Sequence, residues 1–311
     1  MPSDPLGAGY TDPTAAYYLD QIRKYITQQI GGKSASSANT PLYGVSITDS
    51  STATDTASAT SLGAPSTFKI TGDKTNQKLW SLFDRDVLDG SDNAHTLTIT
   101  GAETYGVGPL VSPGMYQKAF SFDGSSDLTS STEADFDRER TDTFSISFWA
   151  KWTSASIVIL VSKMTAVSNT GYEIGTTAAG KVRIRLINTI TTNEVDLITP
   201  LAYNLGYWNH FCFTKAAGSN AAACKLYVNG TAITLTVTTD NLSATILNNI
   251  PLVIGAYDGG TGRLTGLMSD FQFWNVELSS TNANDLAKGR QISYDATNTQ
   301  PIFSGFGSLA T

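Results

Sequence analysis

Four acidic residues alternate along one short stretch of the chain, which suggests a glycosidase pair. Glu133, Asp135, Asp137 and Glu139 occupy every second position. On a β-strand this spacing would place all four carboxylates on one face. Retaining glycosidases need two carboxyl groups about 5 to 5.5 Å apart, one as nucleophile and one as acid/base. The stretch lacks the Val, Ile and Leu residues that would hold such a strand in a sheet, which disfavours catalysis there.

The other residue types with strong chemistry are scarce. The only two histidines are His95 and His210, and no Ser–His–Asp arrangement stands out around them. Two cysteines, Cys212 and Cys224, are too few for a disulfide framework or a zinc site. They lie at equal distances from Gly218, so a hairpin centred there would place them opposite one another. A disulfide bridge and two buried free thiols both fit this spacing.

Composition restricts the classes of partner. Charged residues make up 15% of the 311 residues, and the net charge is −7. Nucleic-acid binding needs clustered Lys and Arg, and no such cluster exists. The longest aliphatic run, Ile157 to Val161, is far shorter than the roughly 20 residues that span a bilayer. The first residues contain neither a basic nor an apolar region, so we expect no signal peptide. We therefore expect neither nucleic acid nor a membrane as a partner.

The elements that must position any site are short strands. From about Leu79 to Gly289 the chain alternates apolar and polar residues in short segments separated by turn residues. Phe144, Ile146 and Phe148 share one face of such a segment, and residues 182–186 alternate apolar with basic side chains. Period two predicts an antiparallel β-sandwich in which each sheet has one face in the core and the other in water.

Residues 1–32 form the first of three flanking segments. Asp12 and Pro13 suit a helix start, and an apolar stripe runs along residues 13–30. A helix with no core of its own must bury that stripe by self-association or in a partner, and we expect a homotrimer.

The other two flanking segments lack periodicity. Residues 33–78 are rich in Ser and Thr, which predicts a linker or extended arm. Residues 291–311 form a tail that contains the apolar stretch Pro301–Gly307, which we expect to dock on another surface.

Seven segments, in this order, resemble the laminin-G-like branch of the concanavalin A-like lectins. They are Leu79–Asp84 with Asp89–Leu97, Ala119–Gly124, Phe144–Trp149, Gly206–Phe211, Leu226–Gly230, Leu252–Gly255 and Gly266–Asn275. The order Trp208, His210, Cys212 is also similar to the pentraxin branch. The resemblance implies an all-β fold, an antiparallel jelly-roll β-sandwich over residues 79–290, preceded by the helix and the linker.

The resemblance also bears on the acids and the histidine. The family has glycosidase members, but it places a surface loop where Glu133 to Glu139 lie, which again argues against catalysis. His210 falls at a core position of the family beside Trp208, which implies a buried histidine rather than a ligand.

A calcium site is the metal site that the resemblance implies. Superfamily members often bind Ca²⁺ with the aspartate that opens the last strand, and Asp270 matches that position. Asp123 is the second candidate ligand, and Asp92 and Asp258 are further loop acids. The alternative is that Asp270 caps a turn and the other acids are solvated.

A sugar platform is the binding site that the resemblance implies. Sugars stack on aromatic rings and form hydrogen bonds with Arg, Asn and Asp. Two sets of residues could form such a platform. One is the basic stripe Lys181, Arg183 and Arg185, and the other is a set of aromatic residues that we expect to be exposed: Trp149, Trp152, Trp274 and Tyr172. Alternation along a strand explains the basic stripe without any ligand.

These features favour a non-enzymatic virion surface protein of a bacteriophage, made in the host cytoplasm. As a capsid decoration, fibre or tail component, it would bind a capsid or tail protein through the N-terminal helix and display a glycan-binding, lectin-like domain for host attachment. The first alternative is a bacterial surface adhesin, extracellular or on the cell surface. The second is a glycan-degrading enzyme.

Overall fold

The computed structural model describes residues 76–109, 118–131, 133–167 and 169–289. The predicted helix in residues 1–32 and the tail of residues 291–311 lie outside these ranges, and so does nearly all of the predicted linker. Its last two residues, Gln77 and Lys78, begin the first described strand. Among the described residues, no helix is long and apolar enough to cross a membrane.

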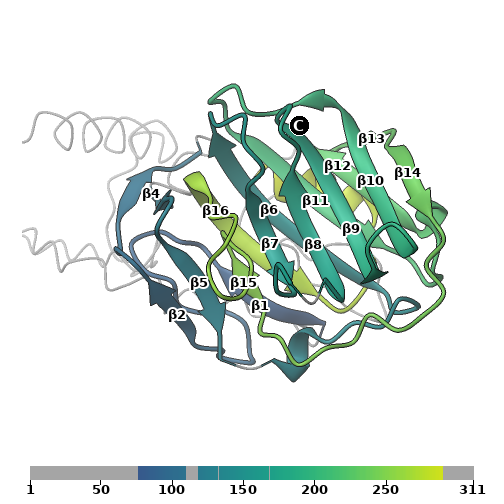
Figure 1. Ribbon diagram of the computed structural model, residues 1–311. Coiled ribbons are helices and arrows are strands. Elements are labelled where there is room, and N and C mark those ends of the chain that lie inside the picture. The colour runs from purple at the N-terminus through teal and green to yellow at the C-terminus, as the bar shows by residue number, and fades with distance from the viewer. Residues whose placement is uncertain (1–75, 110–117, 132, 168, 290–311) are drawn as a thin grey trace, which may run out of the picture. The chain divides into compact units, whose positions relative to one another are not determined.

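Two antiparallel sheets of eight strands each form a sandwich (Figure 1). The first sheet contains β1 (Gln77–Ser81), β3 (Tyr105–Val107), β4 (Lys118–Asp123), β6 (Phe144–Trp152), β11 (Asn209–Lys215), β12 (Cys224–Val228), β13 (Thr231–Ile233) and β16 (Thr265–Trp274). The second contains β2 (Leu97–Thr100), β5 (Asp127–Ser130), β7 (Ile159–Lys163), β8 (Gly171–Thr176), β9 (Lys181–Thr189), β10 (Asn193–Ala202), β14 (Thr236–Asp240) and β15 (Val253–Ile254). This confirms the predicted jelly-roll sandwich.

The strand order shows which strands are central and which are edges. The first sheet runs β13-β12-β11-β6-β16-β4-β3, and β1 pairs with the second half of β16. The second sheet runs β14-β10-β9-β8-β7-β15-β5-β2. Strands β13 and β14 are therefore edges of the two sheets, and they follow one another closely in the chain.

The core between the sheets consists of the alternating residues that the sequence predicted. Phe144, Ile146 and Phe148 of β6 are completely buried, and Val182, Ile184 and Leu186 of β9 face them from the other sheet. The Phe144 ring stacks on Phe273 of β16, with 6.0 Å between the centroids and 8° between the planes. The Phe144 ring also lies 5.3 Å, between centroids, from Tyr172 of β8, so aromatic contacts join the two sheets.

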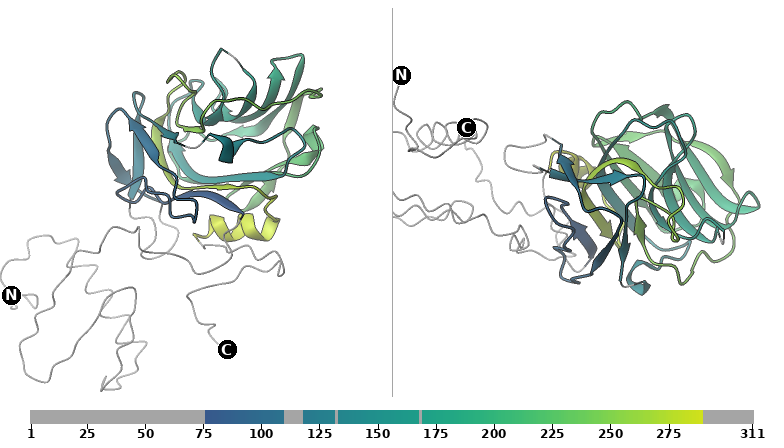
Figure 2. Two further views of the ribbon diagram at one scale, coloured as in Figure 1. Left: turned by 90° about the horizontal axis from the view of Figure 1, so that it is seen from below. Right: turned by 60° about the vertical axis from the view of Figure 1, so that its left-hand side comes forward.

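Short helices complete the domain: η2 (Ala134–Phe136), η3 (Ala221–Ala223) and α2 (Ser280–Ala287). Helix α2 lies beneath the sandwich in the left view of Figure 2, and its Ala283 and Leu286 pack with Cys212, Tyr227 and Trp274 of the first sheet. The sequence predicted a water-facing outer side for this sheet. That was wrong here, because α2 covers part of it, and Ser147 and His210 further along are also completely buried.

The two cysteines are free, and the predicted opposite placement is wrong. In the hairpin of β11 and β12, Cys224 pairs with Lys215, whereas Cys212 pairs with Tyr227. Cys224 faces the main core and Cys212 packs on the α2 side, so the two thiols are on opposite faces of the sheet. The helix η3 in the connecting loop shifts the register away from a hairpin centred on Gly218.

Candidate functional site

The alternating acids lie in a loop around η2 rather than on a strand. Buried Lys163 enters this loop from the end of β7, and its Nζ lies 2.5 Å from Glu133 Oε1 and 2.6 Å from Asp137 Oδ1. The same ammonium donates to the carbonyl of Asn248 at 3.0 Å. Because both carboxylates are held by one buried cation, they fasten the loop over the end of the sandwich. Their arrangement does not present a nucleophile and an acid to a cleft.

A second clamp holds the same loop through a histidine. His95 Nδ1 lies 2.9 Å from Asp89 Oδ2, and its Nε2 lies 2.9 Å from Asp135 Oδ2. The imidazole therefore bridges two carboxylates and contacts no serine. Neither clamp was predicted from the sequence. The close spacing of Asp89 and His95 in the chain is the one signal that could have indicated a contact, the one between these two residues.

His210 is a buried core residue, as predicted. Its Nε2 lies 2.9 Å from Ser147 Oγ, and its ring packs against Trp149 with 5.2 Å between centroids. Burial lowers the pKa of His210 to about 3. The ring is therefore neutral near pH 7 and takes no part in binding at the surface.

The structure does not bring the two predicted calcium ligands together. Asp123 pairs with Thr265 at the start of β16, five residues before Asp270, which is roughly 16 Å along an extended strand. Asp270 is buried at a bulge in β16, where its Oδ1 accepts hydrogen bonds from Trp80 Nε1 and Gln272 Nε2, both at 2.9 Å. The two acids therefore do not fit a single calcium site.

Asp123 is exposed and organises its own turn. Its Oδ1 accepts hydrogen bonds from the hydroxyl and the backbone N–H of Ser125 and from the hydroxyl of Ser126, each at 2.8 Å. These bonds hold the pKa of the carboxyl well below its usual range. Within the described ranges, no group of three or more His, Cys, Asp or Glu side chains is arranged to hold a metal ion.

The predicted sugar platform is wrong in its aromatic residues. Trp149, Trp152, Trp274 and Tyr172 are all at most 6% exposed. Trp152 and Tyr172 belong to the core between the sheets, and Trp274 packs on the α2 side of the first sheet. Large aromatic rings supply much of the apolar area that a sandwich of this size buries.

Two of the three basic residues of the stripe on β9, Arg183 and Arg185, form ion pairs on the outer side of the second sheet. Arg183 forms two hydrogen bonds with Asp196 of β10, and Arg185 Nε lies 2.6 Å from Glu173 Oε1 of β8. Tyr257 also donates its hydroxyl to Glu173, and burial beside that carboxylate raises the pKa of Tyr257. Arg183 and Arg185 thus hold the strands together and are not free for an anionic ligand.

Three hydrogen-bonded loops form an exposed apolar surface at the opposite end of the sandwich from the two clamps. This loop cluster comprises residues 153–158, residues 177–180, and residues 201–208, which begin with the last two residues of β10. Gly206 N–H donates to the Trp152 carbonyl at 3.0 Å, and Tyr203 N–H donates to the Gly180 carbonyl at 2.9 Å. Thr176 Oγ1 donates to the Ser156 carbonyl at 2.9 Å. These bonds make the three loops one continuous surface.

Four of the large exposed hydrophobic side chains of the described residues lie in this cluster. Their exposed fractions are 61% for Ile157, 66% for Leu201, 69% for Leu205 and 70% for Tyr207. The three loop segments contain no charged residue. Apolar side chains gathered on one exposed surface are typical of interaction sites. The loop cluster is therefore the candidate recognition surface.

Tyr207 is the aromatic residue that this surface offers to a ligand. It follows Gly206, whose φ of +75° lies in the left-handed region that favours glycine. A side chain at position 206 would also come close to Thr153. The backbone carbonyl of Tyr207 accepts a hydrogen bond from Asn209 Nδ2 at 3.3 Å, and the residue is exposed. Tyr207 lies in the family-like segment Gly206–Phe211, but its exposure could not be predicted, because the sequence there fits a strand start as well as an exposed loop.

The domain matches a known superfamily. The family model of the concanavalin A-like lectin/glucanases superfamily matches residues 122–284. The chain belongs to this superfamily. The matched region runs from β4 to α2 and includes the loop cluster, so the domain is a lectin-like jelly roll. No curated protein matches the sequence.

Solved structures with the same fold are binding domains of toxins. The binding domain of Paraclostridial Mosquitocidal Protein 1 is 18% identical, with a TM-score of 0.55, over 70% of this chain and 54% of that chain. The binding domain of botulinum neurotoxin DC, solved with rat synaptotagmin II, is 15% identical, with a TM-score of 0.52, over 70% and 52%. A structure of botulinum neurotoxin type C, described with two ganglioside molecules in cell entry, is 14% identical, with a TM-score of 0.51, over 70% and 51%. This chain spans about half the length of these domains, and the likeness shows the fold alone.

Proposed function

We propose that the chain is a non-enzymatic binding module that recognises a glycan through the loop cluster. The observation that carries this proposal is the exposed Tyr207 within an uncharged apolar surface on a lectin-like sandwich. An aromatic ring supplies a face on which a sugar stacks, and the amide of Asn204 and the hydroxyls of Thr153 and Ser154 supply polar groups nearby. The names of the toxin neighbours, which are binding domains, also support a binding role.

The experiment that tests this proposal is a glycan array followed by titration of the best ligand. We expect Tyr207→Ala to weaken binding about fivefold or more, since stacking on one ring contributes about 1 kcal/mol or more. The matched control is Val167→Ala, which removes another exposed hydrophobic side chain outside the loop cluster. Equal affinities of the two variants and the unchanged chain would contradict the assignment of this surface.

A glycan-degrading activity is the competing hypothesis, and the ion pairs of the acidic loop argue against it. Glu133 and Asp137 are both held by Lys163, and Asp135 by His95. Incubation with laminarin, agar and alginate should release no reducing ends. Sustained release that Glu133→Gln abolishes would establish catalysis and overturn the proposal.

For the biological setting, we propose a virion surface protein of a bacteriophage that uses the sandwich for host attachment. The support comes from the sequence: an apolar stripe along residues 13–30 followed by a Ser/Thr-rich stretch suits an anchor and a spacer. In this proposal residues 1–32 bind a capsid or tail protein as a trimer, and several copies raise the avidity for a weakly bound glycan. Mass spectrometry of purified particles tests it, whereas detection on bacterial cells without particles would favour a surface adhesin.

Calcium binding stays a prediction for Asp123, whose turn is exposed and rich in oxygen atoms. Isothermal titration with Ca²⁺ tests it directly, with Asp123→Asn as the matched variant. Heat of binding that the substitution removes would support a site at this turn, and no heat for the unchanged chain would exclude it.

A further inference from the structure

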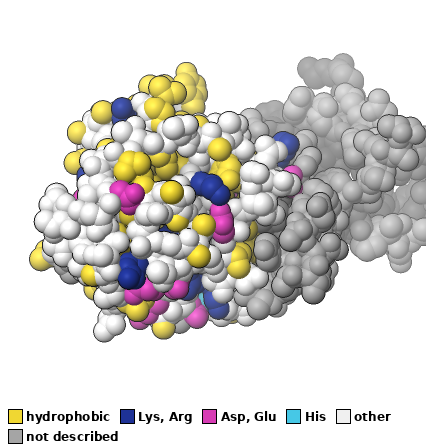
Figure 3. Space-filling model, turned by 90° about the vertical axis from the view of Figure 1, so that its right-hand side faces the viewer, with side chains coloured by type: hydrophobic (Ala, Val, Ile, Leu, Met, Phe, Trp, Pro, Cys, Tyr) yellow, Lys and Arg dark blue, Asp and Glu magenta, His cyan; other side chains and the backbone are white. Residues whose placement is uncertain are grey.

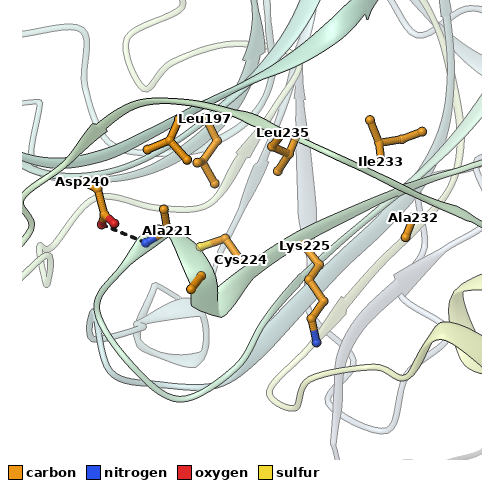
Figure 4. Close-up of a pocket in the computed structure, with 10 residues that line it drawn as sticks. Leu197, Ala221, Cys224, Lys225, Ala232, Ile233, Leu235 and Asp240 are labelled. Atoms are coloured by element: carbon orange, nitrogen blue, oxygen red, sulfur yellow. Dashed lines mark hydrogen bonds between the residues drawn. The ribbon is translucent and has the colours of Figure 1, made fainter.

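The two sheets leave an opening at the side of the sandwich where β13 and β14 form their edges. A cavity of about 370 Å³ lies there, lined by Leu197, Ala221, Ala222, Cys224, Lys225, Ala232, Ile233, Leu235, Val237 and Asp240 (Figure 4). Leu197 and Cys224 are buried core residues at its floor, whereas Val237 at its rim is exposed. Elsewhere large aromatic residues fill the space between the sheets, but here three alanines and a cysteine leave it open.

The chemistry of this cavity fits an apolar occupant. Eight of its ten lining residues are apolar, and both charged ones are engaged with other groups. Asp240 Oδ1 accepts a hydrogen bond from the Ala221 N–H at 2.8 Å. Lys225 Nζ lies 2.9 Å from Glu277 Oε1, and its side chain runs away from the apolar group in Figure 4. A sugar would find few hydrogen-bond partners here, so this cavity is distinct in chemistry from the loop cluster.

Figure 3 shows this side of the domain, with hydrophobic side chains in separate groups among polar atoms. An opening that reaches core residues exposes apolar surface to water, which costs free energy unless something covers it. A cavity of about 150 Å³ is enough for one benzene ring. The opening therefore has room for a phenylalanine side chain and a neighbouring aliphatic group.

The chain itself contains a segment of that composition within reach. Helix α2 packs against β12 and β13, the two strands that supply Cys224, Lys225, Ala232 and Ile233 to the cavity. Gly289 lies two residues after the end of α2. Eleven residues then lead to the apolar segment Pro301–Gly307, which contains Ile302, Phe303 and Phe306. For a coil of eleven residues the root-mean-square span is about 18 Å, and the full extension is about 38 Å.

We infer that this cavity binds the segment Pro301–Gly307 of the same chain, with one of its two phenylalanine rings inserted between β13 and β14. The short connection supplies a high effective concentration, so even a small apolar contact becomes occupied. The bound segment closes the open side of the core and leaves the loop cluster accessible. The inference stands apart from the proposed glycan site, which lies on different residues.

Methyl NMR of the full chain tests this inference. The double variant Phe303→Ser/Phe306→Ser should shift the methyl signals of Ile233 and Leu235, which line the cavity, and leave Leu88 unchanged. The matched control Leu309→Ser, outside the segment, should shift none of them. A synthetic peptide of residues 299–309 added to the double variant should return the shifted signals toward their original positions.

A melting experiment adds an independent measurement on the same variants. The double variant should melt about 2 to 4 °C below the unchanged chain if the contact contributes as one modest apolar cluster, whereas Leu309→Ser should melt with the unchanged chain. Identical methyl spectra of the double variant and the unchanged chain would overturn the inference. Signals that change only on raising the protein concentration would also overturn it, since the segment would then come from a second copy.

Discussion

The ammonium of Lys163 shows how one residue can fix a whole loop. It is buried at the end of β7 and contacts two carboxylates of the acidic loop and a backbone carbonyl. Removal of one member of a buried ion pair leaves charge without compensation and costs several kcal/mol, whereas exposed pairs contribute little. Glu133 and Asp137 remain partly exposed, so water can hydrate them when the lysine is lost.

We therefore expect Lys163→Met to lower the free energy of unfolding by about 1 to 3 kcal/mol, as measured by urea denaturation. The matched control is Lys225→Met, which breaks the exposed pair with Glu277 and should cost less than about 1 kcal/mol. Equal losses in the two variants would contradict the assigned role of Lys163.

Buried His210 makes the free energy of unfolding depend on pH. Burial lowers its pKa to about 3 from 6.5, so the folded ring stays neutral while the unfolded ring takes up a proton below pH 6.5. Stability contributed by the neutral ring is therefore present above pH 6.5 and is lost as the pH falls toward 3. Between pH 7 and pH 4 the loss from this residue amounts to roughly 3 kcal/mol.

The prediction is that His210→Gln shows a smaller loss of stability between pH 7 and pH 4 than the unchanged chain. Urea denaturation of both chains at each pH measures it, and the other acid-sensitive groups cancel in the comparison. If both chains lose the same free energy over this range, the buried neutral histidine does not govern the acid response.

At the scale of residues, the sequence predicted the burial of side chains that follows from local pattern. It did not predict contacts between residues that are far apart in the chain. The burial of His210 followed from its family position, and the alternation of Phe144 and its neighbours followed from period two. The partners of Glu133 and Asp137 did not follow, because Lys163 lies on another strand and nothing near it in the chain indicates burial. Tyr207 was missed for a related reason, since exposure of a ring depends on which loops surround it.

At the scale of elements, α2 was not predicted, although its start carries a clear local signal. Ser279 Oγ accepts a hydrogen bond from the Asn282 N–H at 3.1 Å, and the Ser279 N–H donates to Asn282 Oδ1 at 3.0 Å. This reciprocal capping box satisfies two helix-start donors. The helix then buries Ala283 and Leu286 against the first sheet.

Ser279→Ala should therefore destabilise the domain by about 1 kcal/mol and lower the Tm by about 2 to 4 °C. The neighbouring substitution Ser280→Ala, at the first helical position, keeps the cap and should leave the Tm within about 1 °C of the unchanged chain. Differential scanning calorimetry distinguishes the two. A Ser279→Ala chain that melts with the control would show that the packing of α2 makes its cap dispensable.

The strands were largely predictable and their register was not. Alternation identified β4, β6, β9 and β16, because each has one face in the core. The pairing of β11 with β12 depended on the loop between them, where η3 adds residues that a symmetric turn does not contain. This shift of register moves Cys224 to the opposite face of the sheet from Cys212. The equal spacing of the two cysteines from Gly218 therefore did not predict the positions of their thiols.

At the scale of the whole molecule, all the described strands and helices lie within residues 63–311, which form one of two compact units of the chain. Among the described residues, the core of the sandwich draws on strands of both sheets. Its stability should therefore not need residues 1–62, whereas the proposed trimer does need the apolar stripe of residues 13–30. Folding and assembly are then separable properties of the chain.

We predict that a chain of residues 63–311 melts within about 1 to 2 °C of the full chain but changes in mass from trimer to monomer, as measured by light scattering. A point variant tests the stripe itself: Leu19→Asp with Ile26→Asp should give the same monomer with the Tm unchanged, because two charges on one apolar face oppose its burial. Replacement of Gln21 and Gln28 by Glu is the matched control, which adds two charges away from the apolar stripe without removing an apolar side chain. A trimer that persists after loss of residues 1–62 would place the assembly surface on the sandwich, and the edge strands β13 and β14 would then be the first surface to examine.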